Sequence, residues 1–289
     1  MGKDLGEYRV KPDEKVDLKK WATRIKPVYA SKEDYRTMLE EHVERLSKLQ
    51  ELLYASNRYA VLIIFQAMDA AGKDGCIKHV MSGVNPQGCK VSSFSHPTPV
   101  EQRHDFLWRT TRELPERGQI AIFNRSYYEE VLVVRVHPEI LKAEAIPEDG
   151  DTEKVWQQRF RSIEGLESHL HENGTRIIKF FLHVSKDEQR QRLLDRIVKP
   201  EKNFKIQQAD IAERNYWKEY REAYEDCIAN TTSKVAPWYI VPADDKLTAR
   251  LIVSQVIVKT LEKLDLSLPA TTPARRAELD AMRKALESN

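Results

Sequence analysis

The first segment that could do chemistry is VLIIFQAMDAAGKDG, at residues 61–75. An apolar run ends there in a loop of small residues, which is followed by a helix-compatible stretch. Phosphate-binding loops have this order, because unobstructed backbone N–H groups and the positive end of the helix meet the phosphate oxygens. We expect those N–H groups to come from residues 70–73, because Ala70, Ala71 and Gly72 carry almost no side chain. Lys73 would supply a mobile positive charge, and Asp69 a carboxylate for Mg²⁺.

This loop departs from the common pattern G-x-x-x-x-G-K-[ST]. Ala67 stands at the first glycine position, and Asp74 stands where Ser or Thr would bind the metal. The metal must therefore be held differently, with Asp69 and Asp74 as the nearby carboxylates. The alternative is an ordinary strand-to-helix turn that happens to contain Gly-Lys.

A second candidate segment is FNRSYYEE, at residues 123–130. It follows a short apolar strand and enters a helix. Asn124 stands where many phosphate-loop enzymes place an Asp that organises Mg²⁺. Arg125 can form two hydrogen bonds to phosphate oxygens and stabilise charge in a transition state. The alternative is a helix-start arginine that pairs with Glu129, four positions later.

Strands and helices alternate along the chain, which predicts an α/β fold with a five-stranded parallel sheet covered by helices on both faces. The expected strands are 61–66, 90–95, 119–123, 176–184 and 238–241, and the expected helices are 31–53, 74–81, 101–114, 127–136, 156–170, 185–196, 210–229 and 246–263. Residues 138–152 are expected to form an exposed connection. Ligands of such sheets bind at the carboxyl ends of the strands, where both candidate segments lie.

We expect one domain over residues 1–268, with a basic N-terminal extension at 1–30 and a lid at about 186–220. Residues 269–289 are expected to form a surface appendage. The net charge is only +2, but basic residues gather at 9–26 and 186–205. The alternatives for these stretches are a flexible basic tail and a solvated helix end.

The location of the protein is expected to be the cytoplasm. The longest apolar run, at 60–65, is too short to cross a membrane, and no apolar segment follows the start of the chain. Cys76, Cys89 and Cys227 include no C-x-x-C pair, which is typical of reduced thiols.

Four motifs in order now point to a family: MDAAGKDG at 68–75, FNRSYYE at 123–129, RIVKPEKNFK at 196–205 and APWYIVPADDK at 236–246. On these motifs the chain resembles the polyphosphate kinase 2 family, and most closely its class III branch, from about Tyr8 to Leu268. The resemblance implies a three-layer fold like that of P-loop kinases. It also implies a nucleotide kinase that uses inorganic polyphosphate in place of ATP, with Mg²⁺ or alternatively Mn²⁺.

The resemblance also implies roles for residues. By matching positions, Asp69 and Lys73 are the essential pair of the phosphate loop, Arg125 is the arginine of the second motif, and residues 196–205 form a basic lid. Asn124 and Glu129 match class III, which accepts AMP and ADP. We therefore expect reversible transfer that makes ADP and ATP. The catalytic residues would be Asp69, Lys73, Arg125 and Glu129.

Polyphosphate carries one negative charge per phosphate and no base, so we expect lysines and arginines to line its groove. The expected polyphosphate contacts are Ala70, Ala71, Gly72, Lys73, Asp74, Lys11, Arg196, Lys199, Lys202 and Lys205. The expected nucleotide contacts are Asn124, Arg125, Tyr128 and Glu129.

Two other functions compete with this interpretation. An ATP-dependent nucleoside or nucleotide kinase would need a pocket for a second nucleotide and would have little need for a basic lid. A non-enzymatic binder of polyanions would gain nothing from carboxylates beside the phosphates. We expect no nucleic-acid partner, no membrane contact, and assembly into a homo-oligomer.

Overall fold

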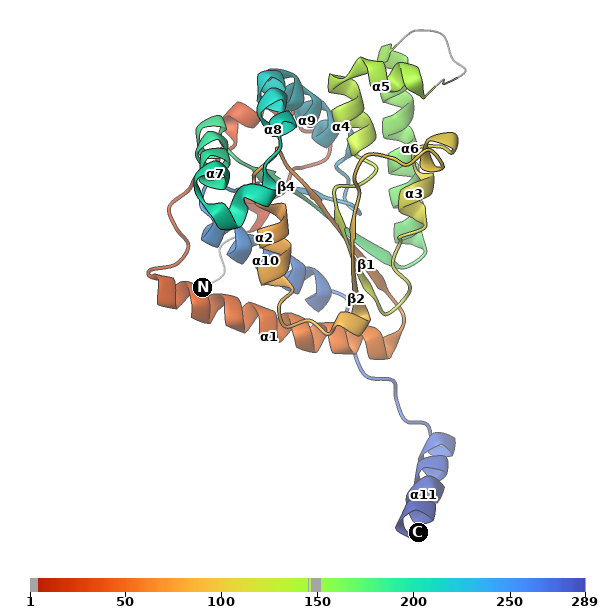
Figure 1. Cartoon of the computed structure of the whole chain (residues 1–289). Coiled ribbons are helices and arrows are strands. Elements are labelled where there is room, and N and C mark those ends of the chain that lie inside the picture. The colour runs from red at the N-terminus through yellow and green to blue at the C-terminus, as the bar shows by residue number, and fades with distance from the viewer. Residues whose placement is uncertain (1–4, 145, 147–151, 289) are drawn as a thin grey trace.

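A single parallel sheet forms the centre of the computed structural model, which describes residues 5–144, 146 and 152–288 (Figure 1). Its strands lie in the order β2-β3-β1-β4-β5. Their bounds are β1 Ala60–Gln66, β2 Cys89–Ser93, β3 Ile120–Asn124, β4 Thr175–His183 and β5 Trp238–Pro242. The predicted number and direction of strands are confirmed.

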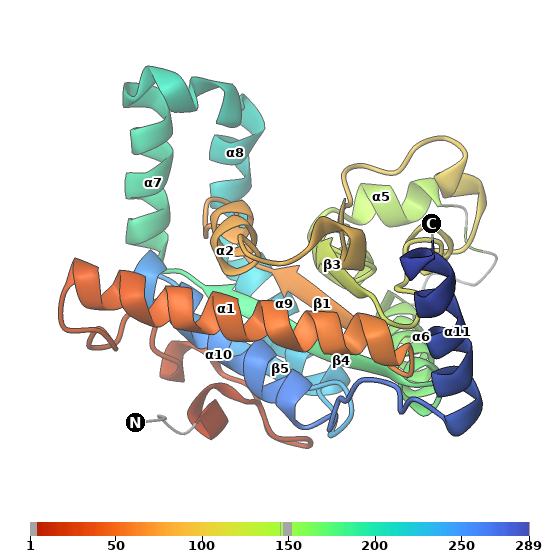
Figure 2. The same cartoon turned by 90° about the horizontal axis from the view of Figure 1, so that it is seen from below.

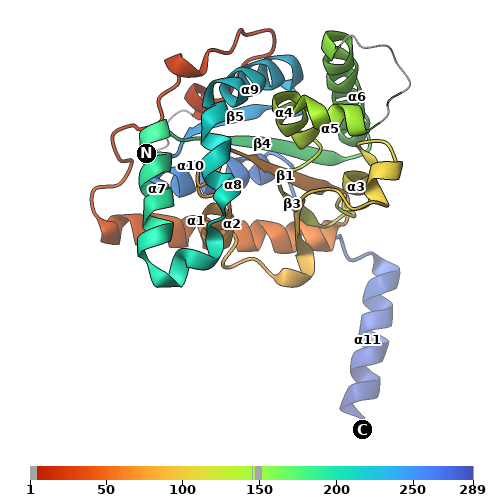
Figure 3. The same cartoon turned by 45° about the horizontal axis from the view of Figure 1, so that its top comes forward.

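Helices cover both faces of the sheet, which confirms the three-layer prediction. The helices are α1 Lys32–Ser56, α2 Lys73–Val80, α3 Trp108–Thr111, α4 Glu129–Val136, α5 Pro138–Ala143, α6 Thr152–Glu172, α7 Lys186–Val198, α8 Gln208–Glu213, α9 Trp217–Thr231, α10 Lys246–Glu262 and α11 Pro273–Glu287. One face carries α1, α2 and α10, and the other carries α4, α6 and α9 (Figure 3). Helices α7 and α8 stand away from the sheet (Figure 2).

Strand β1 is the middle strand, and all seven of its residues are buried. Its continuous apolar sequence follows from this position, since helices cover both faces of a parallel sheet. Connections leave β1 and β3 toward opposite faces, so the crevice between their carboxyl ends is the place where such sheets bind ligands. In the pairing of these strands, Phe65 lies opposite Asn124. The two candidate segments therefore begin side by side.

Two predicted elements differ from the structure. Residues 101–114 form only a short 3-10 turn, Glu101–Arg103, and the short helix α3. Arg109 is buried, and its guanidinium donates to the carbonyl of Ser95 and to Glu130. These contacts hold the segment against buried polar groups, and a continuous helix does not form. Residues 138–143, expected to be a connection, form α5. Pro138 opens that helix, a position where its missing N–H costs nothing.

The described part of the N-terminal extension, residues 5–30, packs against the body, so the alternative of a flexible tail is wrong for the stretch from Tyr8 onward. Tyr8, Val10 and Leu18 are buried in the main core. Val10 N–H donates to the carbonyl of Trp238 at a distance of 3.0 Å, which joins the extension to the start of β5.

The C-terminal helix α11 has no buried residue and lies apart from the sheet in Figure 1. The segment 264–272 connects it to the body. Within the described ranges, no helix is both long enough and apolar enough to span a membrane.

A buried polar network lies under the second motif. Lys179 of β4 is fully buried, and its Nζ donates to Glu167 at 2.5 Å, to the carbonyl of Thr231 at 2.7 Å and to the Tyr128 hydroxyl at 2.9 Å. The hydroxyls of Tyr127 and Tyr128 both donate to Glu167, at 2.9 and 2.8 Å. The start of α4 is thereby anchored to α6 and β4.

This network generates a prediction about stability. Lys179→Met should lower the free energy of unfolding by about 3–5 kcal/mol, because Glu167 is left as a buried charge without a cation. Urea denaturation measures this change. The double variant Lys179→Met with Glu167→Leu should lose less than the single variant. A loss below about 1 kcal/mol in the single variant would show that the pair behaves like an exposed ion pair and does not stabilise the core.

Candidate functional site

The phosphate loop, residues 67–72, connects β1 to α2. Ala70 and Gly72 adopt left-handed conformations, with φ of +58° and +108°. Gly72 precedes the first helical residue and offers no side chain to cap the helix. The first N–H groups of α2 are therefore open to a ligand, and the helix dipole favours an anion there. The backbone geometry predicted for this loop is present.

Lys73 is the first residue of α2. Its Nζ donates to the carbonyl of Ala67 at 3.1 Å, so the cation bridges the two ends of the loop. Burial lowers the pKa of Lys73, and Arg125 lowers it further, while Asp69, Glu129 and Asp74 oppose both effects. An arriving phosphate would favour the charged amine.

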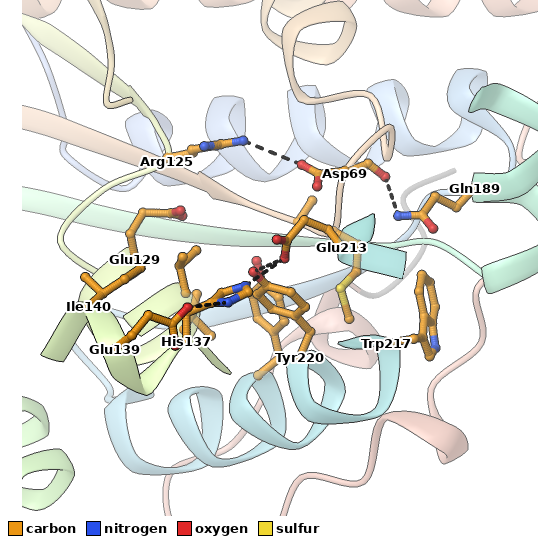
Figure 4. Close-up of a pocket in the computed structure, with 15 residues that line it drawn as sticks. Asp69, Arg125, Glu129, His137, Glu139, Ile140, Gln189, Glu213, Trp217 and Tyr220 are labelled. Carbon is orange, nitrogen blue, oxygen red and sulfur yellow. Dashed lines mark hydrogen bonds and ion pairs between the residues drawn. The ribbon is translucent and has the colours of Figure 1, made fainter. Parts of the chain in front are cut away.

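Arg125 follows β3 directly and is left-handed, with φ of +64°. Its N–H donates to the carbonyl of Phe65 at 3.1 Å, and its guanidinium forms an ion pair with Asp69 at 3.5 Å (Figure 4). The ion pair joins the two candidate segments, and the alternative pairing with Glu129 is not the one observed. Nearby, Asn124 donates to Asp74 at 2.9 Å. Strained backbone of this kind often lies at functional sites.

Glu129 begins α4 and is half-buried beside Arg125. Burial raises the pKa of its carboxyl, while Arg125, Lys73 and a hydrogen bond with Gln66 oppose the rise. The carboxyl of Glu129 therefore lies close enough to Arg125 and Lys73, both predicted to be catalytic, for their positive charges to act on it.

Three cavities meet at Arg125, which lines all of them. The largest, about 960 Å³, lies over the phosphate loop and under the lid. The second, about 710 Å³, extends from Arg125 and Glu129 along α4 and α5 to α6. The third, about 330 Å³, lies between the phosphate loop and α9.

The smallest cavity is shown in Figure 4 and is polar on one side. His137 contacts Glu213 at 3.0 Å and Glu139 at 3.3 Å, and the Tyr220 hydroxyl donates to Glu213 at 2.7 Å. Trp217 and Tyr220 line this cavity and also pack against the main core.

The lid contributes basic side chains to the largest cavity. Arg196 of α7 and both Lys202 and Lys205 of the 3-10 segment Pro200–Lys205 line it, as does the exposed Phe204. Lys199 is not among the lining residues and forms an ion pair with Asp195 at 2.7 Å. The structure brings three of the four predicted lid cations to the phosphate loop.

Two predicted contacts lie elsewhere. Lys11 follows Val10, which is bonded to the first residue of β5, so it lies at the amino edge of the sheet, opposite the phosphate loop. The burial of Tyr8 and Val10 holds it there. Tyr128 is fully buried in the polar network under α4 and cannot reach a nucleotide in this structure. We correct both expectations.

Several site residues have no role predicted from the sequence. Arg250 of α10 lines the largest cavity. For the segment Asp244-Asp245-Lys246 the sequence leaves two alternatives, a nucleotide contact or a helix cap: Asp245 caps α10, and Lys246 lines the largest cavity. Arg192 is buried against the phosphate loop with Gln189. The sequence does place Gln189 and Arg192 three residues apart, on one face of the expected helix, with Glu188 one turn before Arg192. This spacing could have indicated a shared role.

The sequence also did not predict a buried charged cluster, which consists of Glu130, Arg109 and Arg159. Glu130 is buried, pairs with Arg109 at 3.2 Å and Arg159 at 3.7 Å, and lines the second cavity. Burial raises the pKa of Glu130 to about 7, and Glu144 adds to the rise. The two arginines oppose it. Local sequence does not indicate this cluster, because Glu130, Arg109 and Arg159 come from separate segments.

The described residues contain no group of three His, Cys, Asp or Glu side chains placed to hold a metal ion. The carboxylates of Asp69 and Asp74 nevertheless fit Mg²⁺, which takes oxygen ligands and often binds through one or two carboxylates together with substrate phosphates. Both side chains line the largest cavity.

Comparisons with known proteins agree with this geometry. The model of the family described as polyphosphate kinase 2 matches residues 29–268. An ADP-polyphosphate phosphotransferase of Rhodopseudomonas palustris is 64% identical over 281 residues, covering 97% of each chain. An AMP/ADP-polyphosphate phosphotransferase of Meiothermus ruber is 44% identical over 266 residues, covering 92% of this chain and 96% of the relative.

A solved structure extends the likeness to the fold. The polyphosphate kinase 2 of Arthrobacter aurescens superposes with a TM-score of 0.86 at 36% identity, covering 96% of this chain and 97% of that one. The family match covers most of the chain, and both relatives match over nearly their whole length. The chain belongs to the polyphosphate kinase 2 family.

Proposed function

We propose that this protein transfers the terminal phosphoryl group of inorganic polyphosphate to ADP and AMP, making ATP and ADP, and that it catalyses the reverse reaction. The observation that carries the proposal is the junction at Arg125. A cavity of phosphate-binding character meets a second cavity of different character at that residue. The family of the chain and the names of both relatives support transfer between polyphosphate and ADP, and the name of the Meiothermus ruber relative also includes AMP.

The largest cavity is suited to polyphosphate. The basic side chains that line it come from the start of α2, the residue after β3, the lid and α10, and are Lys73, Arg125, Arg192, Arg196, Lys202, Lys205, Lys246 and Arg250. A chain of phosphates offers only charge and oxygen acceptors, so such a lining supplies what recognition requires. Nucleotide donors would need an additional surface for a base.

The second cavity is suited to the acceptor nucleotide. Apolar side chains form much of its lining, including Phe94, Phe106, Val133, Ile140 and Val155. Pockets for organic ligands combine such surface with a few placed polar groups, here Arg109, Glu130 and Arg159. With the nucleoside in this cavity, the acceptor phosphate would lie at Arg125 and Glu129, facing the polyphosphate end.

The proposed chemistry is positioning and charge stabilisation. Lys73 and Arg125 would stabilise the charge on the transferring phosphoryl group, and the N–H groups of Gly72 and Lys73 would bind its oxygens. Asp69 would hold Mg²⁺, or alternatively Mn²⁺. The ion would neutralise phosphate oxygens when bound.

Other expectations stay proposals. They are a homo-oligomeric assembly, a cytoplasmic location, and one domain over residues 1–268 with the lid at about 186–220. The use of AMP rests on Asn124 and Glu129, since the more similar of the two relatives is named for ADP alone.

An acceptor assay tests the function directly. Polyphosphate with ADP should give ATP, and polyphosphate with AMP should give ADP. Lys73→Ala and Asp69→Ala should each lower kcat by about 10²-fold to 10³-fold or more, because both groups act on charge that develops during transfer. Lys78→Ala, an exposed position on the same helix, is the matched control and should keep full activity. Phosphorylation of AMP or ADP by ATP alone, without polyphosphate, would favour the ATP-dependent kinase.

Polyphosphate binding should weaken steeply as salt is added, because several cations must be neutralised and counterions released. Arg196→Ala and Lys202→Ala should each raise the KM for polyphosphate and reduce its dependence on salt. Lys218→Ala, on the outer side of α9 and paired with Glu222, should change neither. Initial rates at several salt concentrations measure this. A KM that does not change with salt would argue for an uncharged donor pocket.

Glu129 should select between acceptors. Its carboxylate repels a longer phosphate tail, yet it can orient water or Mg²⁺ around a shorter one. Glu129→Asn and Glu129→Gln should therefore lower kcat/KM for AMP more than for ADP. Parallel measurements with both acceptors check this, and an equal loss on AMP and ADP would assign Glu129 a structural role.

A further inference from the structure

Helix α7 presents two buried polar side chains to the outside of the phosphate loop. Gln189 Nε2 donates to the carbonyl of Asp69 at 3.0 Å (Figure 4). Arg192 donates from one terminal nitrogen to the carbonyls of Ala70 and Ala71, at 3.2 and 2.6 Å. Three successive carbonyls of the loop are thus bound by side chains of one helix. We call Gln189 and Arg192 the loop brace.

Arg192 has no donor left for a ligand. Its Nε donates to Glu188 at 2.9 Å, and its second terminal nitrogen donates to the carbonyls of Ala243 and Asp244, at 2.6 and 3.1 Å. A guanidinium has five N–H donors, and each has an acceptor here. Although Arg192 borders the largest cavity, its contacts are those of a positioning residue.

The brace determines where the loop N–H groups point. In a trans peptide the carbonyl and the N–H point in opposite directions. Carbonyls held toward α7 therefore direct the N–H groups of Ala70 and Gly72 away from α7. The N–H of Ala71 instead donates to the carbonyl of Met68 at 3.3 Å and closes the turn.

The same brace offsets backbone strain. Ala70 is left-handed although it carries a Cβ, and such a conformation persists only where surrounding contacts determine it. Its carbonyl is one of those bound by Arg192. Without the brace, the loop would be free to relax to another conformation and lose the arrangement that binds an anion.

The brace also joins the loop to both stems of the lid. Arg196, one turn beyond Arg192 on α7, lines the polyphosphate cavity. Arg214, at the other stem, donates to Gln189 Oε1 at 2.6 Å and to the carbonyl of Lys186 at 3.1 Å. Both stems of the lid are therefore connected through Gln189 and Arg192 to the three carbonyls of the loop.

We propose that Gln189 and Arg192 are positioning residues that hold the phosphate loop in its anion-binding conformation and couple it to the lid. The proposal rests on the proposed function only in taking polyphosphate as the anion. It adds two residues that do not touch the reacting atoms.

The test uses Arg192→Lys, which keeps the charge but not the fork of donors, and Gln189→Met, which keeps the size but not the amide. Arg190→Lys, an exposed arginine on the same helix, is the matched control. In the full-length protein, hydrogen–deuterium exchange of the peptide spanning 68–75 reports on the loop. Binding of inorganic tripolyphosphate, measured by calorimetry, reports on the site without any transfer reaction.

Both brace variants should exchange faster at 68–75, bind tripolyphosphate less tightly, and raise the KM for polyphosphate by about 10-fold to 100-fold, the range known for residues that orient a binding group. The KM for ADP should stay within about twofold, and Arg190→Lys should match the wild type. If wild-type protein fails to use polyphosphate while the loop still depends on Arg192, only the proposed function fails.

Two results would overturn the brace. Unchanged exchange at 68–75 with lost tripolyphosphate binding would make Arg192 a direct ligand of the anion. An equal rise in the KM for both substrates, together with faster exchange throughout the chain, would show a general loss of stability.

Discussion

The ion pair between Asp69 and Arg125 is the contact on which the geometry of the site depends. It crosses the crevice between β1 and β3, where the chain leaves the two strands toward opposite faces. The N–H of Arg125 bonds to Phe65 and extends the ladder of β1 and β3, while the left-handed backbone turns the chain toward α4. This side chain lines each of the three cavities, so in the proposed function its position would set how an acceptor in one faces a phosphate in another.

The two halves of the site are supported by different means. The second motif is fixed from within the core, because Tyr127 and Tyr128 are bonded to Glu167, which is itself paired with Lys179. Burying charges costs several kcal/mol unless every lone pair and proton has a partner, and here the ammonium has three acceptors. The phosphate loop is instead held from the lid side by α7. The second motif is therefore held by contacts within the core, whereas the phosphate loop is held by contacts with α7.

Local signals in the sequence predicted much of the fold. The expected helices at 31–53, 185–196 and 246–263 begin at or next to Ser31, Ser185 and Asp245. These residues cap the helices, since a cap bonds to N–H groups only two or three residues away. The brace shows what such signals miss. Arg190 and Arg192 look alike in a charge pattern. Only Arg192 donates to the carbonyls of Ala71 and Ala243, which are 121 and 51 residues away in sequence. Every residue has a carbonyl, so the sequence does not show which one an arginine will bind. Lys11 illustrates the reverse case: its charge suggested a phosphate contact, but the apolar neighbours that bury the segment decide its place.

The charges of the site also constrain the order in which it can fill. Arg125 pairs with Asp69, a carboxylate that is partly buried, and the same guanidinium lines the largest cavity. A phosphate bound by Arg125 would compete with Asp69 for its charge. Because a partly buried carboxylate without a cation is unfavourable, the arriving anion makes a cation at Asp69 more favourable than before. The described residues hold no cluster of three metal-ligating side chains, so Mg²⁺ at Asp69 and Asp74 would take its remaining ligands from substrate oxygens and water. The proposed metal site is therefore one that the phosphates help to build, and Asp69 is the residue through which anion and cation binding are linked.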